Sequence, residues 1–445
     1  MKALKQDPNN STAWNDLGYG LKEGETVVVA GKPYTERGCY ERALELEPNN
    51  STAWNNLGYA LKETEKGIVA GMLYSQRECY LRALELDPDN SMAWFNLGTT
   101  LAESEDVEVA GEHYTSRDCY LRALELDPSD SNAWNNFGYA LKEDERVVVS
   151  KKAYTKRHCY LKALELDPDN SNAWNNLGAN LMDGESVTLG ENQYTKRECC
   201  AKALENDANN SNSWYNLGAT LEEGGTVEVD GIQYSKRDCF VRSLELDPSD
   251  GIAWSKLGYS LKEGENAVVS RKAYSECECY VNALELNPDD DTTWNNLGFA
   301  LKEGESMEVS KEIYTKRGCY VKALELNPGM SKAWANLGTA LGELETMVVA
   351  GDHYAKRDCL VKALELDPNN SRAWNDLGYG MRTVMVAGKP YTQRDCYLKA
   401  LELDPNYSNA WYYLGAIMDE GETMIVAGRP YALKDCLEEA AKANR

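Results

Sequence analysis

Thirteen cysteines and three histidines are the residues of this sequence with the most specific chemistry, since thiols and imidazoles bind metals and assist catalysis. Eleven of the cysteines recur at one place in a repeated pattern, from Cys39 to Cys436. Neighbouring copies on packed helices would lie about 8–10 Å apart, beyond the roughly 7 Å between Cα atoms that a disulfide tolerates. The histidines, His113, His158 and His353, are not close in sequence to the two further cysteines. We therefore expect buried free thiols, with no metal site.

Other catalytic patterns are missing from the sequence. It contains no Ser–His–Asp set, glycine-rich phosphate loop or cofactor fingerprint, so we expect no enzyme, no catalytic residue and no cofactor. A formal net charge of −25 argues against binding to nucleic acid or to anionic membranes, because phosphate binding needs a basic surface. No run of eighteen apolar residues occurs, which argues against a membrane-spanning helix. The expected partner is a protein or peptide, of basic or neutral charge.

Arginine recurs near the start of a set of predicted helices, as in Arg37, Arg77 and Arg117. A positive charge there opposes the helix dipole, so another interaction must outweigh that cost. Glutamate is nearly as regular a short way before these helices, as in Glu25 and Glu65. We expect structural Glu–Arg pairs that brace the intervening segment, and a ligand-binding row of arginines is the alternative.

A recurrent carboxamide is the remaining candidate chemistry. At the place of Asp16, seven copies of the pattern carry asparagine: Asn56, Asn96, Asn136, Asn176, Asn216, Asn296 and Asn336. An amide offers two N–H donors and a carbonyl acceptor, which suits it to a peptide backbone. These seven residues are called the asparagine row below. Simple solvation of an exposed face is the alternative role.

An internal repeat positions all of these residues. Trp14 recurs every forty residues up to Trp374, and Trp411 follows after thirty-seven; these are all eleven tryptophans of the chain. With no linker or change of composition between copies, a single continuous solenoid is expected. Residues 1–10 are expected to be a partial second helix of a preceding unit, followed by repeats 1 to 11 at 11–50, 51–90, 91–130, 131–170, 171–210, 211–250, 251–290, 291–330, 331–370, 371–407 and 408–445.

Each repeat predicts two helices. Apolar residues spaced as Trp14, Leu17 and Leu21 mark one face of a first helix, with Ser11 as its N-cap and Gly24 as its stop. A second helix follows, in which Cys39, Tyr40, Ala43 and Leu44 form a buried face and Pro48 marks the end. Ser or Thr opens it in nine copies, and several carry an acid three residues later, which predicts capping boxes at Ser75–Glu78, Thr195–Glu198 and Ser235–Asp238.

The segment between the two helices predicts a β-hairpin. The places of Val27 and Val29 are mostly apolar, that of Val28 varies freely, and that of Tyr34 is always tyrosine. This period of two is typical of a half-buried strand, and Ala30–Gly31 suits a two-residue turn whose type stays open.

The hairpins of adjacent repeats are expected to pair into one ribbon, because two strands span about the same distance as one helical layer. Pro33, Pro390 and Pro430, near the ends of the array, would then block further pairing; chance placement is the alternative.

The residues Trp14, Leu17, Gly18, Ala43 and Pro48, with "ALELDPNN" in several copies, resemble the tetratricopeptide repeat across essentially the whole chain. The family unit is shorter, at about 34 residues, and the extra residues here form the expected hairpin. The resemblance implies a mainly α fold: a right-handed α-solenoid, or superhelix, with a β-hairpin inserted between the two helices of each repeat.

The resemblance also implies a function. In the family, the face of the first helix that would carry Thr12, Asp16, Tyr19 and Glu23 lines a concave groove, where some members hold an extended peptide with a row of asparagines. The asparagine row is thus the expected peptide-binding site of a protein–protein interaction scaffold, with acidic residues such as Glu63 at its rim. The alternative is a structural protein that assembles head to tail into fibres, and an accessory array lacking its catalytic domain is a third class.

Two joints between elements depart from the pattern. The stretch 203–210 lacks the leucine and proline of the other internal joints, and repeat 10 has lost three residues before its hairpin. We expect looser packing at 206–210 and a shortened helix end at 381–384.

The expected location is cytoplasmic, since many free thiols suit a reducing compartment. An extracellular fibre glycosylated at its sequons is the alternative. The sequons begin at Asn9, Asn10, Asn49, Asn50, Asn209, Asn369 and Asn406, where turn chemistry alone also explains asparagine.

Overall fold

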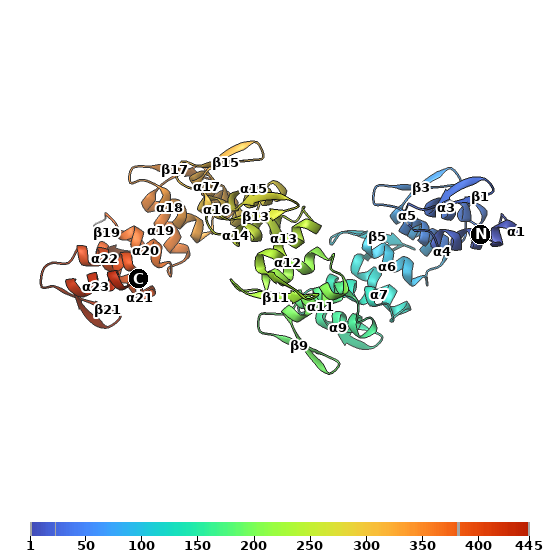
Figure 1. The fold of residues 1–445 in the computed structure, drawn as a ribbon, viewed down its shortest axis with the longest axis horizontal. Coiled ribbons are helices and arrows are strands. Elements are labelled where there is room, and N and C mark those ends of the chain that lie inside the picture. Colours follow the sequence, from blue (N-terminus) through green and yellow to red (C-terminus); the bar gives the residue numbers. More distant parts are fainter. Residues whose placement is uncertain (1, 23, 381–382, 444–445) are drawn as a thin grey trace. The chain divides into compact units, whose positions relative to one another are not determined.

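The computed structural model describes residues 2–22, 24–380 and 383–443. They form pairs of short helices with a β-hairpin between the two members of each pair (Figure 1). The chain divides into two compact units, one of Met1–Glu222 with Val227–Gln233 and the other of Glu223–Thr226 with Tyr234–Arg445. In both units, consecutive helices pack against each other as layers of a helical-repeat solenoid. The single right-handed superhelix over all eleven repeats stays a prediction.

The first unit contains these helices: α1 (Lys2–Gln6), α2 (Ser11–Tyr19), α3 (Glu36–Leu46), α4 (Ser51–Ala60), α5 (Gln76–Leu86), α6 (Ser91–Thr99), α7 (Ser116–Leu126), α8 (Ser131–Ala140), α9 (Lys156–Leu166), α10 (Ser171–Ala179), α11 (Lys196–Asn206) and α12 (Ser211–Ala219). Its strands are β1 (Thr26–Val29), β2 (Lys32–Thr35), β3 (Lys66–Val69), β4 (Met72–Ser75), β5 (Asp106–Val109), β6 (Glu112–Thr115), β7 (Val147–Val149), β8 (Lys152–Tyr154), β9 (Ser186–Leu189) and β10 (Asn192–Thr195). Strands β11 (Thr226–Val229) and β12 (Ile232–Ser235) lie where the chain divides.

The second unit contains these helices: α13 (Lys236–Leu246), α14 (Gly251–Tyr259), α15 (Glu276–Leu286), α16 (Asp291–Ala300), α17 (Lys316–Leu326), α18 (Ser331–Ala340), α19 (Lys356–Leu366), α20 (Ser371–Gly378), α21 (Gln393–Leu403), α22 (Ser408–Ala416) and α23 (Leu433–Ala443). Its strands are β13 (Asn266–Val269), β14 (Lys272–Ser275), β15 (Ser306–Val309), β16 (Glu312–Thr315), β17 (Thr346–Val349), β18 (Asp352–Ala355), β19 (Thr383–Val386), β20 (Lys389–Thr392), β21 (Thr423–Val426) and β22 (Arg429–Ala432).

The first helices begin and end one or more residues away from the predicted places. The predicted N-cap Ser11 is wrong: Asn10 is the N-cap, and its side chain accepts a hydrogen bond from the N–H of Ala13 at 2.9 Å. Asn and Asp cap helices as well as Ser does, so the preceding residue takes the role. The stop predicted at Gly24 is also wrong, because α2 ends at Tyr19 and Gly24 lies in the following turn at φ 80°.

The capping boxes predicted for the second helices are confirmed. Glu78 accepts a hydrogen bond from the N–H of Ser75 at 2.6 Å, and the Ser75 hydroxyl accepts one from the N–H of Glu78 at 3.3 Å. The same reciprocal bonds occur at Thr195–Glu198 and Ser235–Asp238. They satisfy N–H groups that a helix start otherwise leaves free, and so they fix where each second helix begins.

The predicted β-hairpin is confirmed. Val27 lies opposite Tyr34 and Val28 opposite Pro33 across the antiparallel pair, which puts Val27, Val29 and Tyr34 on the inner face. Ala30 and Gly31 both have positive φ, 50° and 79°, which defines the turn that the sequence left open as type I′. The twist of this turn matches that of the strands it joins.

The ribbon predicted between hairpins is wrong. Over the described part of the chain, every sheet has two strands, so the hairpins are not paired with one another. Two hairpins instead bond to the second helix of the preceding repeat: the N–H of Ile68 donates to Oε1 of Glu41 at 2.8 Å, and that of Ser310 to Oε1 of Glu285 at 2.6 Å. A carboxylate thus satisfies an outward N–H that a neighbouring strand would have used. The prolines therefore have no adjacent strand to exclude.

An aromatic pair ties each hairpin to its first helix. The rings of Trp14 and Tyr34 lie 4.6 Å apart between centroids, and the Trp14 indole N–H donates to the carbonyl of Pro8 at 2.8 Å. Nearby, a Cβ built on Gly18 would lie only 2.7 Å from Cε1 of Tyr40, so glycine lets the two helices of a repeat approach. Trp14 and Tyr40 are both buried.

The cysteines lie in this core as free thiols, as expected. Twelve of the thirteen are buried, and Cys277 is half-buried. Burial raises the pKa of the Cys79 thiol to about 12, with Glu78 and Glu41 adding to the effect. Such a thiol stays protonated at neutral pH and behaves as a small apolar side chain.

Of the two irregular joints, the one at 206–210 keeps the standard helix end, whereas repeat 10 has a shortened first helix. Helix α11 ends at Asn206, where the N–H of Asp207 bonds to the carbonyl of Ala203 at 2.9 Å, as in other repeats. Helix α20 ends at Gly378, after eight residues, and is shorter than the other first helices. Of the predicted change at 381–384, residues 381 and 382 lie outside the described residues.

Candidate functional site

The asparagine row lies on the first helices, where it joins consecutive repeats. Nδ2 of Asn56 donates to Oδ1 of Asn15 at 3.0 Å, and Nδ2 of Asn96 donates to Oδ1 of Asn55 at 2.9 Å. The equivalent bonds are Asn176 to Asn135 at 2.9 Å, Asn216 to Asn175 at 2.9 Å and Asn336 to Asn295 at 3.0 Å. Each bond crosses from one repeat to the one before it.

The acceptors are a second set of asparagines, one residue before the row and deeper in the packing. Asn55 is only 3% exposed, and its own Nδ2 donates to Oδ1 of Asn56 at 3.4 Å. The amides therefore form a chain from Asn96 through Asn55 and Asn56 to Asn15. Asn136 and Asn296 are acceptors within their own repeats: Oδ1 of Asn136 accepts from Nδ2 of Asn135 at 3.0 Å, and Oδ1 of Asn296 accepts from Nδ2 of Asn295 at 3.5 Å.

These bonds correct one expectation about the row. The sequence suggested amides on a face without a packing duty, yet Asn96 is buried and the other six are half-buried. Each amide of the row has more donors and acceptors than these bonds use, so it can form a further hydrogen bond with solvent. The row therefore has a structural role, and its predicted binding of a peptide stays a prediction.

Exposed aromatic rings flank the row at one place in the first helix. Tyr19 is 80% exposed, Tyr59 72% and Tyr259 68%. Phe299 has 61% of its surface exposed at the equivalent place. The sequence placed Tyr19 on this face but did not identify the rings as binding residues. The available signal was their recurrence at one place of a solvent-facing helix, since exposed large apolar groups are informative.

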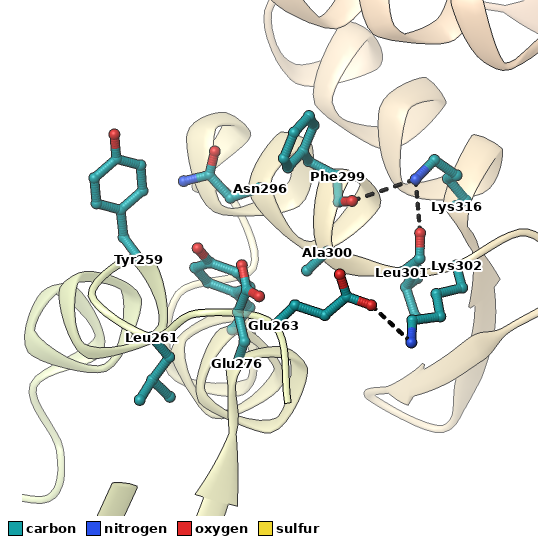
Figure 2. Close-up of a pocket in the computed structure, with 11 residues that line it drawn as sticks. Tyr259, Leu261, Glu263, Glu276, Asn296, Phe299, Ala300, Leu301, Lys302 and Lys316 are labelled. Carbon is teal, nitrogen blue, oxygen red and sulfur yellow. Dashed lines mark hydrogen bonds and ion pairs between the residues drawn. The ribbon is translucent and has the colours of Figure 1, made fainter. Parts of the chain in front are cut away.

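Two hollows on this face are lined by both exposed rings and amides of the row, one at a joint of the first unit and one at a joint of the second. The hollow of the first unit has a volume of about 760 Å³, and its lining includes Tyr19, Asn56 and Tyr59. That of the second unit measures about 460 Å³ and is lined in part by Tyr259 and Phe299 (Figure 2). Both lie along first helices of adjacent repeats.

The acidic rim predicted for this face is mixed with lysine. Glu63 and Glu103 are exposed, and Glu23 lies outside the described residues. In the second unit, Nζ of Lys302 lies 2.8 Å from Oε1 of Glu263. This exposed ion pair neutralises part of the rim.

The recurrent arginines form structural pairs, but between repeats. Nη1 of Arg77 lies 2.6 Å from Oε1 of Glu105 in the next repeat, and Nη2 donates to the carbonyl of Thr100. The guanidinium thus caps the C-terminal end of the first helix in the next repeat, where a positive charge is favourable. This interaction offsets the unfavourable position of the same charge at the N-terminus of its own helix. The equivalent pairs are Arg37–Glu65, Arg117–Glu145, Arg157–Glu185, Arg237–Glu265, Arg317–Glu345 and Arg394–Glu422.

Neither a metal cluster nor a membrane span is found in the part of the chain that the structure describes. No three His, Cys, Asp or Glu side chains among those residues gather as metal ligands. None of the described helices has both the length and the apolar composition to cross a bilayer.

A comparison with protein-family models matches six segments of the chain to a model described as the tetratricopeptide repeat. The matched segments are 39–67, 79–109, 119–148, 159–181, 199–228 and 396–428. A search of curated protein sequences finds no match.

Solved structures that resemble the chain include three proteins at low identity. YrrB, a TPR protein with an unusual peptide-binding site, is 20% identical with a TM-score of 0.30, covering 49% of this chain and 96% of its own. The hetero-tetramer Cut9-Hcn1 of APC/C is 15% identical with a TM-score of 0.43, covering 86% of this chain and 72% of its own. Yeast Tom70 is 14% identical with a TM-score of 0.31, covering 98% and 94%.

Proposed function

We propose that this chain, which belongs to the tetratricopeptide repeat family, binds an extended segment of a partner protein along its first helices. Its repeats are an extended form of the family unit, with a hairpin in each. Arrays of such repeats are protein–protein interaction scaffolds. The role is binding without catalysis. The segment lies across the asparagine row, within a unit, and is basic or neutral in charge.

The observation that carries this proposal is the coincidence of amides, exposed rings and hollows on one face. Asn56 lines the larger hollow together with the exposed rings of Tyr19 and Tyr59. Amides recognise peptide N–H and C=O groups, while aromatic rings supply contact area at a low cost in side-chain entropy. A face with both can bind a backbone with little dependence on its sequence.

The inter-repeat bonds of the row favour such binding. Nδ2 of Asn176 is held by Oδ1 of Asn135, and Nδ2 of Asn216 by Oδ1 of Asn175, each at 2.9 Å. An amide that is already oriented loses less entropy when it binds a ligand than a mobile one does. The structural and binding roles are therefore compatible.

The test is recovery of partners on the immobilised full chain, followed by titration of the bound segment. The variant Asn136→Ala, Asn176→Ala, Asn216→Ala should weaken binding by about 0.5–1.5 kcal/mol for each lost amide bond. Because these amides also join repeats, the variant's thermal unfolding must be measured as well. A matched control replaces three exposed turn asparagines by alanine: Asn209, Asn369 and Asn406.

Weaker binding and unchanged binding by the row variant lead to different conclusions. The proposal requires weaker binding by the row variant at a temperature where it is fully folded, and unchanged binding by the control. Equal affinity of wild type and row variant for every recovered segment would show that the row only joins repeats.

A further inference from the structure

The two hollows are built from the same residues, six repeats apart. One is lined by Tyr19, Glu36, Tyr40, Asn56 and Tyr59, and the other by Tyr259, Glu276, Tyr280, Asn296 and Phe299. These sets are called the first and second acidic–aromatic pockets. The five residues of each set come from two adjacent repeats, and the first hollow extends further, to Met92, Phe95 and Asp130 of the third repeat.

The sequence marks these two joints and no others. Glutamate is the first residue of the second helix, directly after the N-cap, only at Glu36 and Glu276, and the other nine copies carry Gln, Ser, Lys or Leu there. Consecutive repeats both carry an aromatic residue at the place of Tyr19 only in repeats 1 and 2 and in repeats 7 and 8. Two independent features of the sequence thus coincide at the same pair of joints.

The carboxylate of each pocket is set against aromatic rings. Glu276 is the first residue of α15 and half-buried, one turn before the buried Tyr280. Burial raises the pKa of Glu276, and a hydrogen bond from Tyr280 partly offsets that effect. In Figure 2 the Glu276 carboxylate is drawn between Tyr259 and Phe299, below the amide of Asn296. A carboxylate that has lost part of its water gains from a cationic partner.

The cations at the rim of the second pocket already have partners. Lys302 pairs with Glu263 at 2.8 Å, and Nζ of Lys316 donates to the carbonyl of Leu301 at 2.6 Å and to that of Phe299 at 3.3 Å. In the first unit Gln76 replaces Lys316, and its Nε2 donates to the carbonyl of Leu61 at 3.2 Å. The first pocket is lined by Glu36, Lys62 and Asp130, so its charged lining side chains carry one more negative charge than those of the second.

We propose that each acidic–aromatic pocket receives an arginine side chain of the bound segment, with the guanidinium paired to Glu36 or Glu276 and stacked on the exposed rings. The proposal rests on the proposed function, because it assigns what the segment carries. Arginine fits better than lysine, since its planar guanidinium stacks on aromatic faces and donates two parallel bonds to a carboxylate. The chain's net charge of −25 would also draw a basic segment to it.

The test is calorimetric titration of the full chain with a fifteen-residue Gly/Ser/Asn peptide that carries one arginine. The matched peptides carry citrulline, which keeps the shape without the charge, or lysine. We expect the arginine peptide to bind at least tenfold more tightly than the citrulline peptide, and several-fold more tightly than the lysine peptide. Because Lys316 lines the second pocket, whereas Gln76 at the equivalent place carries no charge, Glu36→Gln should cause a larger loss of affinity than Glu276→Gln.

The decisive variant is Glu36→Gln, Glu276→Gln. Its affinity for the arginine peptide should fall at least tenfold, and its affinity for the citrulline peptide should not change. Glutamine is native at this place in Gln76 and Gln393, so the helices accept it. The control is Glu45→Gln, Glu285→Gln, which makes the same charge change at the other end of the same two helices, α3 and α15. The control should bind the arginine peptide as wild type does.

Unchanged arginine binding by the Glu36→Gln, Glu276→Gln variant would overturn the assignment, as would equal binding of arginine and citrulline peptides. Failure of the pockets and failure of the proposed function give different results. If the recovered partner segment still depends on the asparagine row while the arginine peptide does not bind, only the pockets are wrong. If the recovered segment is also insensitive to the row, the proposed function fails as well.

Discussion

Glycine at the place of Gly18 sets how closely the two helices of a repeat approach. A Cβ there would meet Cε1 of Tyr40 at 2.7 Å, whereas one on Gly20, at the end of the same helix, would have its nearest contact at 3.6 Å. Tyr40 is buried and cannot move away freely.

Gly18→Ala should therefore destabilise the fold by about 1–3 kcal/mol, as overpacked cores do. Gly20→Ala, the matched control, should be neutral or slightly stabilising, because its space is open and alanine restricts the unfolded chain. Thermal unfolding of both variants checks this. A Gly18→Ala protein as stable as the Gly20→Ala protein would contradict the packing argument.

Lysine occupies a backbone conformation at Lys151 that suits glycine. Its φ is 70°, at the second central position of a type I′ turn where other repeats carry glycine, such as Gly71 at φ 80°. A left-handed conformation costs a non-glycine residue about 1–2 kcal/mol of stability, which a change to glycine removes. Glycine also gains conformational freedom in the unfolded chain, which offsets about 0.5–1 kcal/mol of that improvement.

Lys151→Gly should stabilise the fold by about 0.5–1 kcal/mol. The reverse change in an equivalent turn, Gly71→Lys, should destabilise it by a similar amount. The midpoint of urea unfolding measures both. If the two changes shift stability in the same direction, turn strain is not what separates the two turns.

At the scale of elements, the Arg–Glu joint is absent between repeats 7 and 8, because Cys277 stands where other repeats carry arginine. Burial raises the pKa of the Cys277 thiol to about 11, and the nearby carboxylates of Glu276 and Glu305 add to the effect. The joint before it has the ion pair Arg237–Glu265.

Cys277→Arg should restore the missing joint, with Glu305 as the partner of the new guanidinium. Because such pairs are partly exposed, as at Arg77 with 33% and Glu105 with 41% of the side chain exposed, the gain should be modest, about 0.5–1 kcal/mol. Amide hydrogen exchange at the end of α16 should slow in this variant. The further change Glu305→Gln should remove most of the gain, and a gain that survives it would exclude the ion pair as the cause.

The joint at 206–210 keeps its backbone bonds but has Asn206 and Ala208 in place of leucine and proline. Trp214 donates to the carbonyl of Ala208 at 2.9 Å, as Trp254 does to Pro248 at 2.9 Å. Asn206 is exposed where Leu246 is half-buried. We expect faster hydrogen exchange at 206–210 than at 246–250, because local opening loses less buried surface. Equal protection at the two joints would contradict this prediction.

The elements that could be predicted from the sequence are those whose signal lies within one repeat. Capping boxes such as Ser75–Glu78 and the hairpin face of Val27, Val29 and Tyr34 follow from residue type and spacing. The inter-repeat contacts could not be predicted in this way. The bond from Asn96 to Asn55 and that from Ile68 to Glu41 depend on the stacking of layers, which no single repeat specifies. The ribbon was wrong for the same reason, and at Ile68 a carboxylate takes the N–H that a neighbouring strand would have used.

At the scale of the whole molecule, each unit is held together by contacts between adjacent layers, so stability is distributed along it. The amides, the Arg–Glu pairs and the hairpins all join one repeat to the next. The first-helix face carries exposed rings in some layers, as at Tyr59 and Phe299. The head-to-tail fibre stays a prediction, which electron microscopy of the purified chain tests.

The central claim is that the first helices contact the partner. A photoreactive phenylalanine placed at Tyr59, which is 72% exposed on α4, tests it most directly against one placed at Ile313, which is 73% exposed on the outer face of a hairpin. With a recovered partner segment at saturating concentration, we expect crosslinks from position 59 and only background from position 313. Crosslinks from position 313, with none from position 59, would contradict the claim.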